Sequence, residues 1–188
     1  MQGVYRVTSG GRELIETFVA APGPMGWRYV GRLADQATGE HLQLVDYVVD
    51  VEWNLVRVRM ADASGWEAIV GPIPGGLEAW TGTPEAERIQ QFPGAVAVWT
   101  PSPCSLLAGD RRARIAGVWS FPAVVPVVAG EPEELLVSLK LAGHEAISTP
   151  AGKAPVEVVM VEAGNGPRKA LVRRDLPIAC EGWFELIG

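Results

Sequence analysis

The segment Val45-Asp46-Tyr47-Val48-Val49-Asp50-Val51-Glu52 indicates a β-rich fold. Residues 45, 47, 49 and 51 are apolar, whereas residues 46, 50 and 52 are acidic. Because successive side chains of a strand point to opposite faces, this alternation predicts a strand with one buried face and one face in water. A turn at Trp53-Asn54 and a second alternating strand over 56–60 would place Asp50 opposite Arg57 as a cross-strand ion pair.

Similar strand signals, separated by glycine- and proline-rich turns, occupy the first and last thirds of the chain. In the first third they cover residues 4–8, 12–19, 27–33 and 42–52, and in the last third 134–141, 143–149, 155–162, 168–174 and 182–187. The two series predict two antiparallel meanders of hairpins.

The two thirds also share a seven-residue pattern, Gly-x-Glu-x-Ile-x-Thr, at residues 11–17 and again at 143–149. We therefore expect a single domain over residues 1–188, in which residues 1–82 and 95–188 form related halves. The alternative is coincidence, because four matched positions can recur by chance between two strand beginnings.

The middle of the chain has a different composition. Residues 65–132 hold nine of the fifteen prolines, which predicts wrapped loops and edge strands because proline cannot donate to a strand ladder. A short helix is expected over residues 84–91, with Thr83 as its cap and Pro84 in its first turn. Apolar segments at 68–74, 105–108 and 121–128 are expected either to seal the core or to line a cavity.

Composition excludes several classes of protein. Hydrophobic residues make up 48% of the 188 residues, so a packed core is expected rather than disorder. The net charge of −6 argues against nucleic acid as a partner. No secretory signal or transmembrane run is present, which favours a cytoplasmic protein whose Cys104 and Cys180 are free, buried thiols.

Motifs for common chemistry are missing from the sequence. We find no nucleophile elbow, phosphate-binding loop or dinucleotide fingerprint, and therefore expect no cofactor. His41 and His144 are the only histidines, so a three-histidine metal site is excluded and no metal is expected.

Aromatic residues offer the best candidates for a binding site. Seven tryptophans are many for this length, and they can serve either as core or as the lining of a cavity that packs on an acyl chain or a sugar face. Trp53 and Trp66 are expected to be exposed, because Trp53 sits in a turn and Trp66 follows Gly65 in a loop. The candidate ligand-binding residues are Trp27, Tyr29, Tyr47, Trp53, Arg57, Arg59, Trp66 and Trp119.

Two regions carry a family resemblance. The run 141–152, followed by Val156-Glu157-Val158-Val159 and by Gly182-Trp183-Phe184-Glu185-Leu186, resembles the spiral β-roll proteins related to bacterial lipoprotein carriers. Gly26-Trp27-Arg28 with residues 45–53 and 56–59 is similar to the cytoplasmic glycolipid-binding family that shares this roll. The resemblance implies a curved antiparallel sheet that cradles a lipid-like ligand without a cofactor.

The predicted fold class is therefore all-β with minor α: an antiparallel spiral β-roll or incomplete barrel with one short helix. The first interpretation of function is non-enzymatic binding of a hydrophobic or amphipathic small molecule, with a glycolipid as the guess from the resemblance. The alternative is a hydrolase of a glycoside or ester that uses Asp50 with Glu52, or Cys104 with His144. A third interpretation is an interaction module that forms a homodimer through its strand edges.

Overall fold

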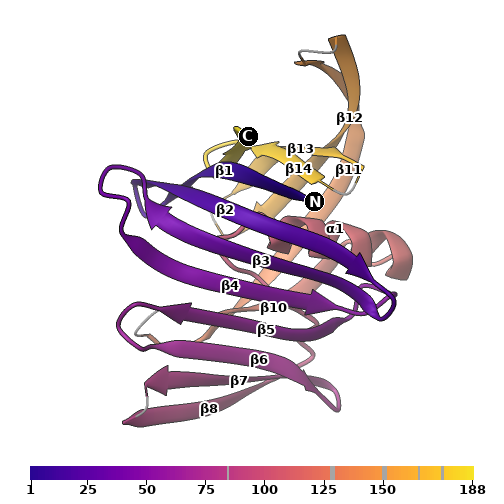
Figure 1. The fold of residues 1–188 in the computed structure, drawn as a ribbon. Coiled ribbons are helices and arrows are strands. Elements are labelled where there is room, and N and C mark those ends of the chain that lie inside the picture. Colours follow the sequence, from indigo (N-terminus) through magenta and orange to yellow (C-terminus); the bar gives the residue numbers. More distant parts are fainter. Residues whose placement is uncertain (84, 128–129, 150–151, 165, 175) are drawn as a thin grey trace.

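The computed structural model describes residues 1–83, 85–127, 130–149, 152–164, 166–174 and 176–188. Their strands form one curled sheet in the order β8-β7-β6-β5-β4-β3-β2-β1-β15-β14-β13-β12-β11-β10-β9 (Figure 1). The elements are β1 (Gln2–Ser9), β2 (Arg12–Gly23), β3 (Gly26–Asp35), β4 (His41–Val49), β5 (Leu55–Asp62), β6 (Glu67–Ile73), β7 (Gly76–Thr83), β8 (Ala86–Pro93), β9 (Ala97–Val98), α1 (Cys104–Ala116), β10 (Ser120–Val125), β11 (Glu133–Thr149), β12 (Gly152–Ala163), β13 (Pro167–Arg173), β14 (Leu176–Cys180) and β15 (Phe184–Leu186).

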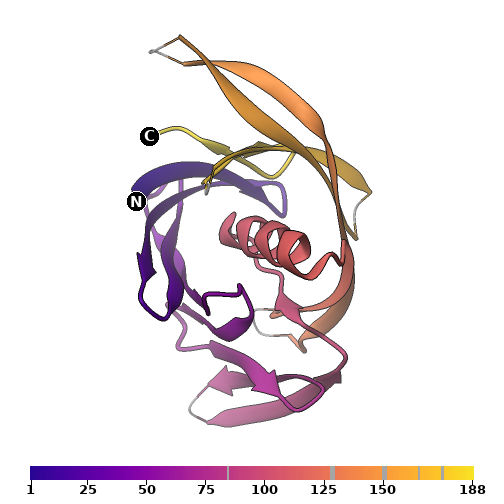
Figure 2. The ribbon, with the colours of Figure 1, turned by 90° about the vertical axis from the view of Figure 1, so that its right-hand side faces the viewer.

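The two meanders join where the first and last strands pair, with Tyr5 of β1 opposite Leu186 of β15. Neighbouring strands are antiparallel throughout the described residues except at the pair β9–β10. The sheet curls without closing and surrounds α1 (Figure 2). The predicted fold class, an antiparallel incomplete barrel with one short helix, is confirmed.

The core lies on the concave face of the sheet, as the alternation in β4 predicts. Val45, Tyr47 and Val49 are at most 2% exposed, and the inward-facing residues of the other strands join them in one apolar cluster. The Tyr47 hydroxyl donates to the carbonyl of Val98 in β9 at 3.2 Å, so the far edge of the sheet packs over β4. The hydrophobic pattern therefore fixes which face of β4 is buried.

Helix α1 fills the concave side of the roll. It begins after Pro103, whose fixed φ suits a helix start, and it ends at Gly117, whose φ of 67° is the left-handed conformation that glycine adopts readily. Leu106 and Leu107 are at most 1% exposed and belong to the same cluster as the strands. The interior that a carrier would offer to a ligand is thus occupied by the protein's own side chains.

The helix expected at residues 84–91 is wrong. Most of that segment is strand β8, which pairs with β7 along its length, for example Ile89 opposite Trp80; Pro84 lies outside the described residues. A helix of two turns forms few hydrogen bonds to offset the conformational entropy that its nucleation costs. A strand at the same position forms backbone hydrogen bonds with β7 along its length. Tertiary pairing therefore overrides the local capping signal.

The proline-rich middle is more regular than predicted. Residues 68–73 belong to strand β6, residues 105–108 to helix α1, and residues 121–125 to strand β10, whereas Val128 lies outside the described residues. Most of their apolar side chains are buried in the core, so these segments help to seal it, whereas Ile69 lies exposed on the convex face. Pro93 is the last residue of β8, which is a position that suits proline because the strand lies at a sheet edge.

The two copies of the seven-residue pattern lie in different surroundings. In β2, Glu13, Ile15 and Thr17 lie on the convex face, opposite the buried Leu14 and Phe18. The second copy follows an irregularity between Leu141 and Gly143 and forms the outer part of the long β11–β12 hairpin, which projects beyond the rest of the sheet (Figure 1). A common origin of the two halves stays a prediction.

Candidate functional site

A pocket of about 480 Å³ opens at one end of the roll, where the β2–β3 hairpin meets the β4–β5 turn. This volume falls in the range of small-molecule sites, about 300–1,000 Å³. The pocket is lined by Met1, Ala20, Pro22, Gly23, Gly26, Trp27, Asp50, Val51 and Trp53. Two of the predicted ligand-binding residues, Trp27 and Trp53, therefore meet in one site.

The two indoles form the aromatic wall of this pocket. Their ring centroids lie 5.3 Å apart with an interplanar angle of 35°. Trp27 is 7% exposed and belongs to the core, whereas Trp53 is half-buried and packs on its edge. Trp53 has a φ of 63°, a left-handed conformation that bulky side chains rarely adopt. The surrounding turn must therefore hold Trp53 in place.

Hydrogen bonds around Asp50 fix the conformation of the turn. Its Oδ1 accepts the backbone N–H groups of Glu52 at 2.9 Å and Asn54 at 2.8 Å. The backbone N–H of Trp53 donates to the Asp50 carbonyl at 3.1 Å. Arg112 of α1 donates to the side-chain oxygen of Asn54 at 2.5 Å and ties the turn to the helix. The aromatic wall is thus preorganised.

Gly26 lines the pocket at a position where a residue with a side chain would not fit. A Cβ atom at this position would lie 2.0 Å from the carbonyl oxygen of Val49, and the φ of Gly26 is 138°. The backbone of β3 therefore approaches the end of β4 closely, which brings Trp27 beside the β4–β5 turn.

The rim of the pocket is apolar and faces solvent. Val51 in the β4–β5 turn is 66% exposed, and Met1 is 48% exposed. The α-amino group of Met1 donates to the carbonyl of Ala20 at 2.7 Å, and the carboxylate of Asp50 is occupied by the turn. The arrangement suits an apolar or uncharged molecule better than an ion.

The aromatic wall continues through the core to a second pocket at the other end of β1. Neighbouring rings along this path have centroids between 4.8 and 5.8 Å apart. The path runs through Trp53, Trp27, Tyr29, Phe18, Tyr5, Phe184, Trp183 and Trp99. The second pocket, of about 450 Å³, is lined by Trp99, Trp183 and the Gly10-Gly11 turn among others.

The other predicted aromatic residues lie away from the first pocket. Tyr29, Tyr47 and Trp66 are at most 4% exposed and are core residues, so the prediction that Trp66 is exposed is wrong. Trp66 follows a turn, but its side chain is buried in the core immediately before β6 begins. Trp119 is half-buried and packs against the core between α1 and β10.

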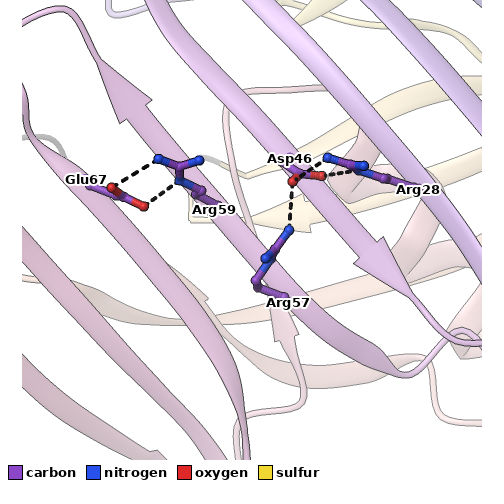
Figure 3. Close-up of polar contacts among 5 residues, drawn as sticks. All are labelled: Arg28, Asp46, Arg57, Arg59 and Glu67. Atoms are coloured by element: carbon purple, nitrogen blue, oxygen red, sulfur yellow. Dashed lines mark hydrogen bonds and ion pairs between the residues drawn. The ribbon is translucent and has the colours of Figure 1, made fainter.

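Arg57 and Arg59 lie on the convex face, within two ion-pair clusters (Figure 3). Asp46 accepts from Arg28 at 2.8 Å and from Arg57 at 2.9 Å. Arg59 pairs with Glu67 of the neighbouring strand at 2.5 Å. These guanidinium groups are engaged with carboxylates on the outside of the sheet and do not reach the aromatic pocket.

The expected ion pair between Asp50 and Arg57 is therefore wrong. Strand β4 ends at Val49, and the register shifts there, so Arg57 pairs with Val48. The turn is longer than two residues, and Asp50 belongs to it rather than to the strand.

The candidate hydrolytic groups do not form an enclosed pair. Asp50 and Glu52 lie in the turn, where the Asn54 amide donates to both carboxylates, at 3.1 and 3.3 Å. Cys104 is buried at the start of α1, and burial raises the pKa of its thiol to about 12. His144 has a side chain 67% exposed on the β11–β12 hairpin, 4.0 Å from Glu157. The cysteines are free and buried, as predicted.

Sequence reasoning missed a buried carboxyl group, Glu16. Its Oε1 accepts the hydroxyl groups of Tyr29 and Ser102, both at 2.6 Å, while Oε2 is buried without a hydrogen-bond partner among the described residues. Burial raises the pKa of Glu16 to about 7, although the two hydrogen bonds act to lower it. The only available signal was the position of Glu16 between Leu14 and Phe18, on the apolar face of β2.

In the described part of the chain, no three or more His, Cys, Asp or Glu side chains gather in a way that could hold a metal ion. Helix α1, with 13 residues, is too short to cross a bilayer, and the described residues contain no other helix that could.

Comparison with known proteins supports the fold and leaves the activity open. No protein-family model and no curated protein matches the chain. The chain is similar to a solved structure, the β-barrel-like protein of the domain of unknown function DUF1849 from Brucella abortus. The match has a TM-score of 0.57 and 10% sequence identity, and it covers 99% of this chain and 94% of that one. The chain therefore has a β-barrel-like fold.

Proposed function

We propose that this protein binds a hydrophobic or amphipathic small molecule, without chemical turnover, in the pocket formed by Trp27 and Trp53. The observation that carries the proposal is the pairing of two indoles at the open end of the roll, held there by a strained turn that is fixed by hydrogen bonds to Asp50. Strained conformations tend to persist where the local geometry serves a function.

The chemistry of the pocket supports an apolar contact. Binding sites for small molecules are concave and mainly apolar, with few polar groups to fix orientation. Here the indoles supply flat surfaces, and Met1 and Val51 supply exposed apolar area at the rim. An acyl chain would remove this apolar area from water, which is favourable by about 25 cal/mol per Å².

A glycolipid is the ligand class that the family resemblance implies, and two features of the pocket are compatible with it. Its indole faces can pack on the apolar face of a sugar ring as well as on an acyl chain. Its mouth faces solvent, so a polar headgroup could remain hydrated while the apolar part lies against Trp27. The interior of the roll is filled by α1, which limits the proposed site to the end of the barrel.

A titration with octyl glucoside, below the concentration at which it forms micelles, tests the proposal. We expect saturable binding by isothermal titration calorimetry for the wild type and loss of binding for Trp53→Gly. Glycine adopts positive φ readily, so this variant removes the indole while relieving the strained turn.

The matched control is Trp80→Ala, which removes a half-buried indole from the convex face of β7, far from the pocket in the sheet order. Binding should survive this change. Equal loss in the two variants, or the absence of saturable binding to alkyl glucosides and fatty acids alike, would contradict the proposal.

A further inference from the structure

Strand β8 leaves one long edge of the sheet unpaired. It is the terminal strand, and within the described ranges no strand pairs with its outer side (Figure 1). It has eight residues, whereas β9 at the opposite end of the sheet has two residues, both buried. A free strand edge is a template for pairing with another chain. The short, covered β9 cannot serve as the partner for β8 in a head-to-tail arrangement.

The hydrogen-bonding pattern shows which backbone groups of β8 point outward. Gly94 N–H donates to the Gly75 carbonyl at 2.7 Å, and the carbonyl oxygens of Phe92 and Ala86 face β7. Because hydrogen-bonded and non-hydrogen-bonded pairs alternate along an antiparallel ladder, Ala86, Arg88, Gln90 and Phe92 bond to β7. The N–H and C=O groups of the intervening residues, Glu87, Ile89 and Gln91, therefore point to the free edge.

An apolar row on the convex face ends at this edge. Ile69 of β6 lies opposite Trp80 of β7, and Trp80 lies opposite Ile89 of β8. Ile89 is 66% exposed and Ile69 is 36% exposed. An edge strand is usually protected by charged side chains, yet the centre of β8 presents an isoleucine.

We propose that the protein forms a symmetric dimer in which β8 pairs with β8 of a second copy, antiparallel and centred on Ile89. In this register Ile89 lies opposite its own counterpart, and Glu87 lies opposite Gln91 of the second copy. Each outward N–H group of Glu87, Ile89 and Gln91 then meets an outward carbonyl. The row Ile69–Trp80–Ile89 continues across the two-fold axis into the same row of the other copy.

Neighbouring registers are less favourable. A slip of two residues in one direction places Arg88 opposite Arg88 of the second copy, and like charges directly opposite each other are destabilising. A slip in the other direction replaces the pair of isoleucines by isoleucine opposite Gln91. The pattern of charge and apolarity in β8 therefore selects one partner, a second copy of this chain, and one register. Because a single strand pair buries little surface, the dimer should dissociate on dilution.

Sedimentation velocity over a wide range of protein concentrations tests this inference. We expect a concentration-dependent dimer for the wild type and at least about a tenfold weaker association for Ile89→Lys. The matched control is Ile69→Lys, which makes the same chemical change on the same face two strands from the edge, and it should leave association nearly unchanged. Circular dichroism should report the same fold for all three proteins.

A second measurement tests the register independently. Pyrene attached to Ile89→Cys should show excimer emission in the dimer, because the two labels would meet at the two-fold axis, whereas pyrene attached to Ile69→Cys should not. A wild type that stays monomeric at every concentration overturns the inference. So does a dimer that Ile69→Lys weakens as much as Ile89→Lys, since the contact would then lie elsewhere. Neither result bears on ligand binding at Trp53.

Discussion

The Ser102 hydroxyl donates a hydrogen bond of 2.6 Å to Glu16 Oε1 in the interior of the roll, across 86 residues of sequence. This contact joins β2 to the loop that leads into α1. Tyr29 donates to the same oxygen, and Oε2 is buried without a partner among the described residues. A buried carboxylate that is incompletely hydrogen-bonded is costly, so the folded protein favours the neutral acid.

The first prediction is a pH dependence of stability that Glu16 causes. Burial raises the pKa of Glu16 from its ordinary value of 4.5 to about 7. The contribution of Glu16 to stability is therefore fully present below about pH 4.5 and is lost as pH rises towards 7. The loss amounts to about 3 kcal/mol, since one pKa unit corresponds to about 1.4 kcal/mol.

The variant Glu16→Gln isolates this effect because glutamine does not titrate. Urea denaturation at about pH 5 and about pH 8 should show the variant gaining stability relative to the wild type at the higher pH. An equal difference in unfolding free energy at the two pH values would show that Glu16 has no raised pKa in the folded state.

A second prediction concerns the close approach at Gly26. Gly26→Ala should destabilise the protein by more than about 2 kcal/mol, because the new methyl group would collide with the backbone of Val49 and Asp50 in addition to the strain at positive φ. Gly39→Ala is the control: Gly39 also has a positive φ, of 72°, but open space surrounds it. Thermal unfolding should separate the two variants, and similar melting temperatures would contradict the close packing of β3 on the end of β4.

A third prediction concerns the ion pairs on the convex face. Asp46→Ala removes the shared partner of Arg28 and Arg57 and should cost about 1 kcal/mol, a modest amount because the arginine side chains are 61% and 47% exposed. The loss should shrink in high salt. Arg88→Ala breaks a pair with Glu131 whose members are 65% and 74% exposed, and it should change the unfolding free energy by less than about 0.5 kcal/mol. The opposite order of the two effects would be inconsistent with this account.

Much of the fold could be predicted from alternation and turn residues. The period of two in β4 identifies its buried face because one face of the sheet meets the core, and the glycine turns separate the hairpins. The helix could not be placed in this way. Thr83-Pro84 carries a helix-start signal, but residues 86–93 pair with β7, whereas Pro103, which does begin the helix, stands among prolines that suggest a loop. Where two segments carry local signals of similar strength, tertiary pairing determines which of them forms a helix.

The candidate site was predicted only in part. Trp27 and Trp53 belong to the aromatic pocket, but alternation alone could not separate them from Tyr47 and Trp66, whose rings belong to the core. From the sequence, the exposed arginines on β5 could be either ligand contacts or members of ion pairs. The structure shows that Arg57 pairs with Asp46 of the neighbouring strand β4. Pocket residues drawn from separate turns leave no periodic signature in the sequence.

Fluorine NMR of protein labelled with 5-fluorotryptophan can report directly whether Trp27 and Trp53 form a ligand site. Seven indole resonances are expected, one for each tryptophan. Octyl glucoside below its micelle-forming concentration should shift the resonances of Trp27 and Trp53 in a saturable way and leave that of Trp80 unchanged. Uniform small shifts of all resonances, or shifts confined to other tryptophans, would show that Trp27 and Trp53 do not form the binding site.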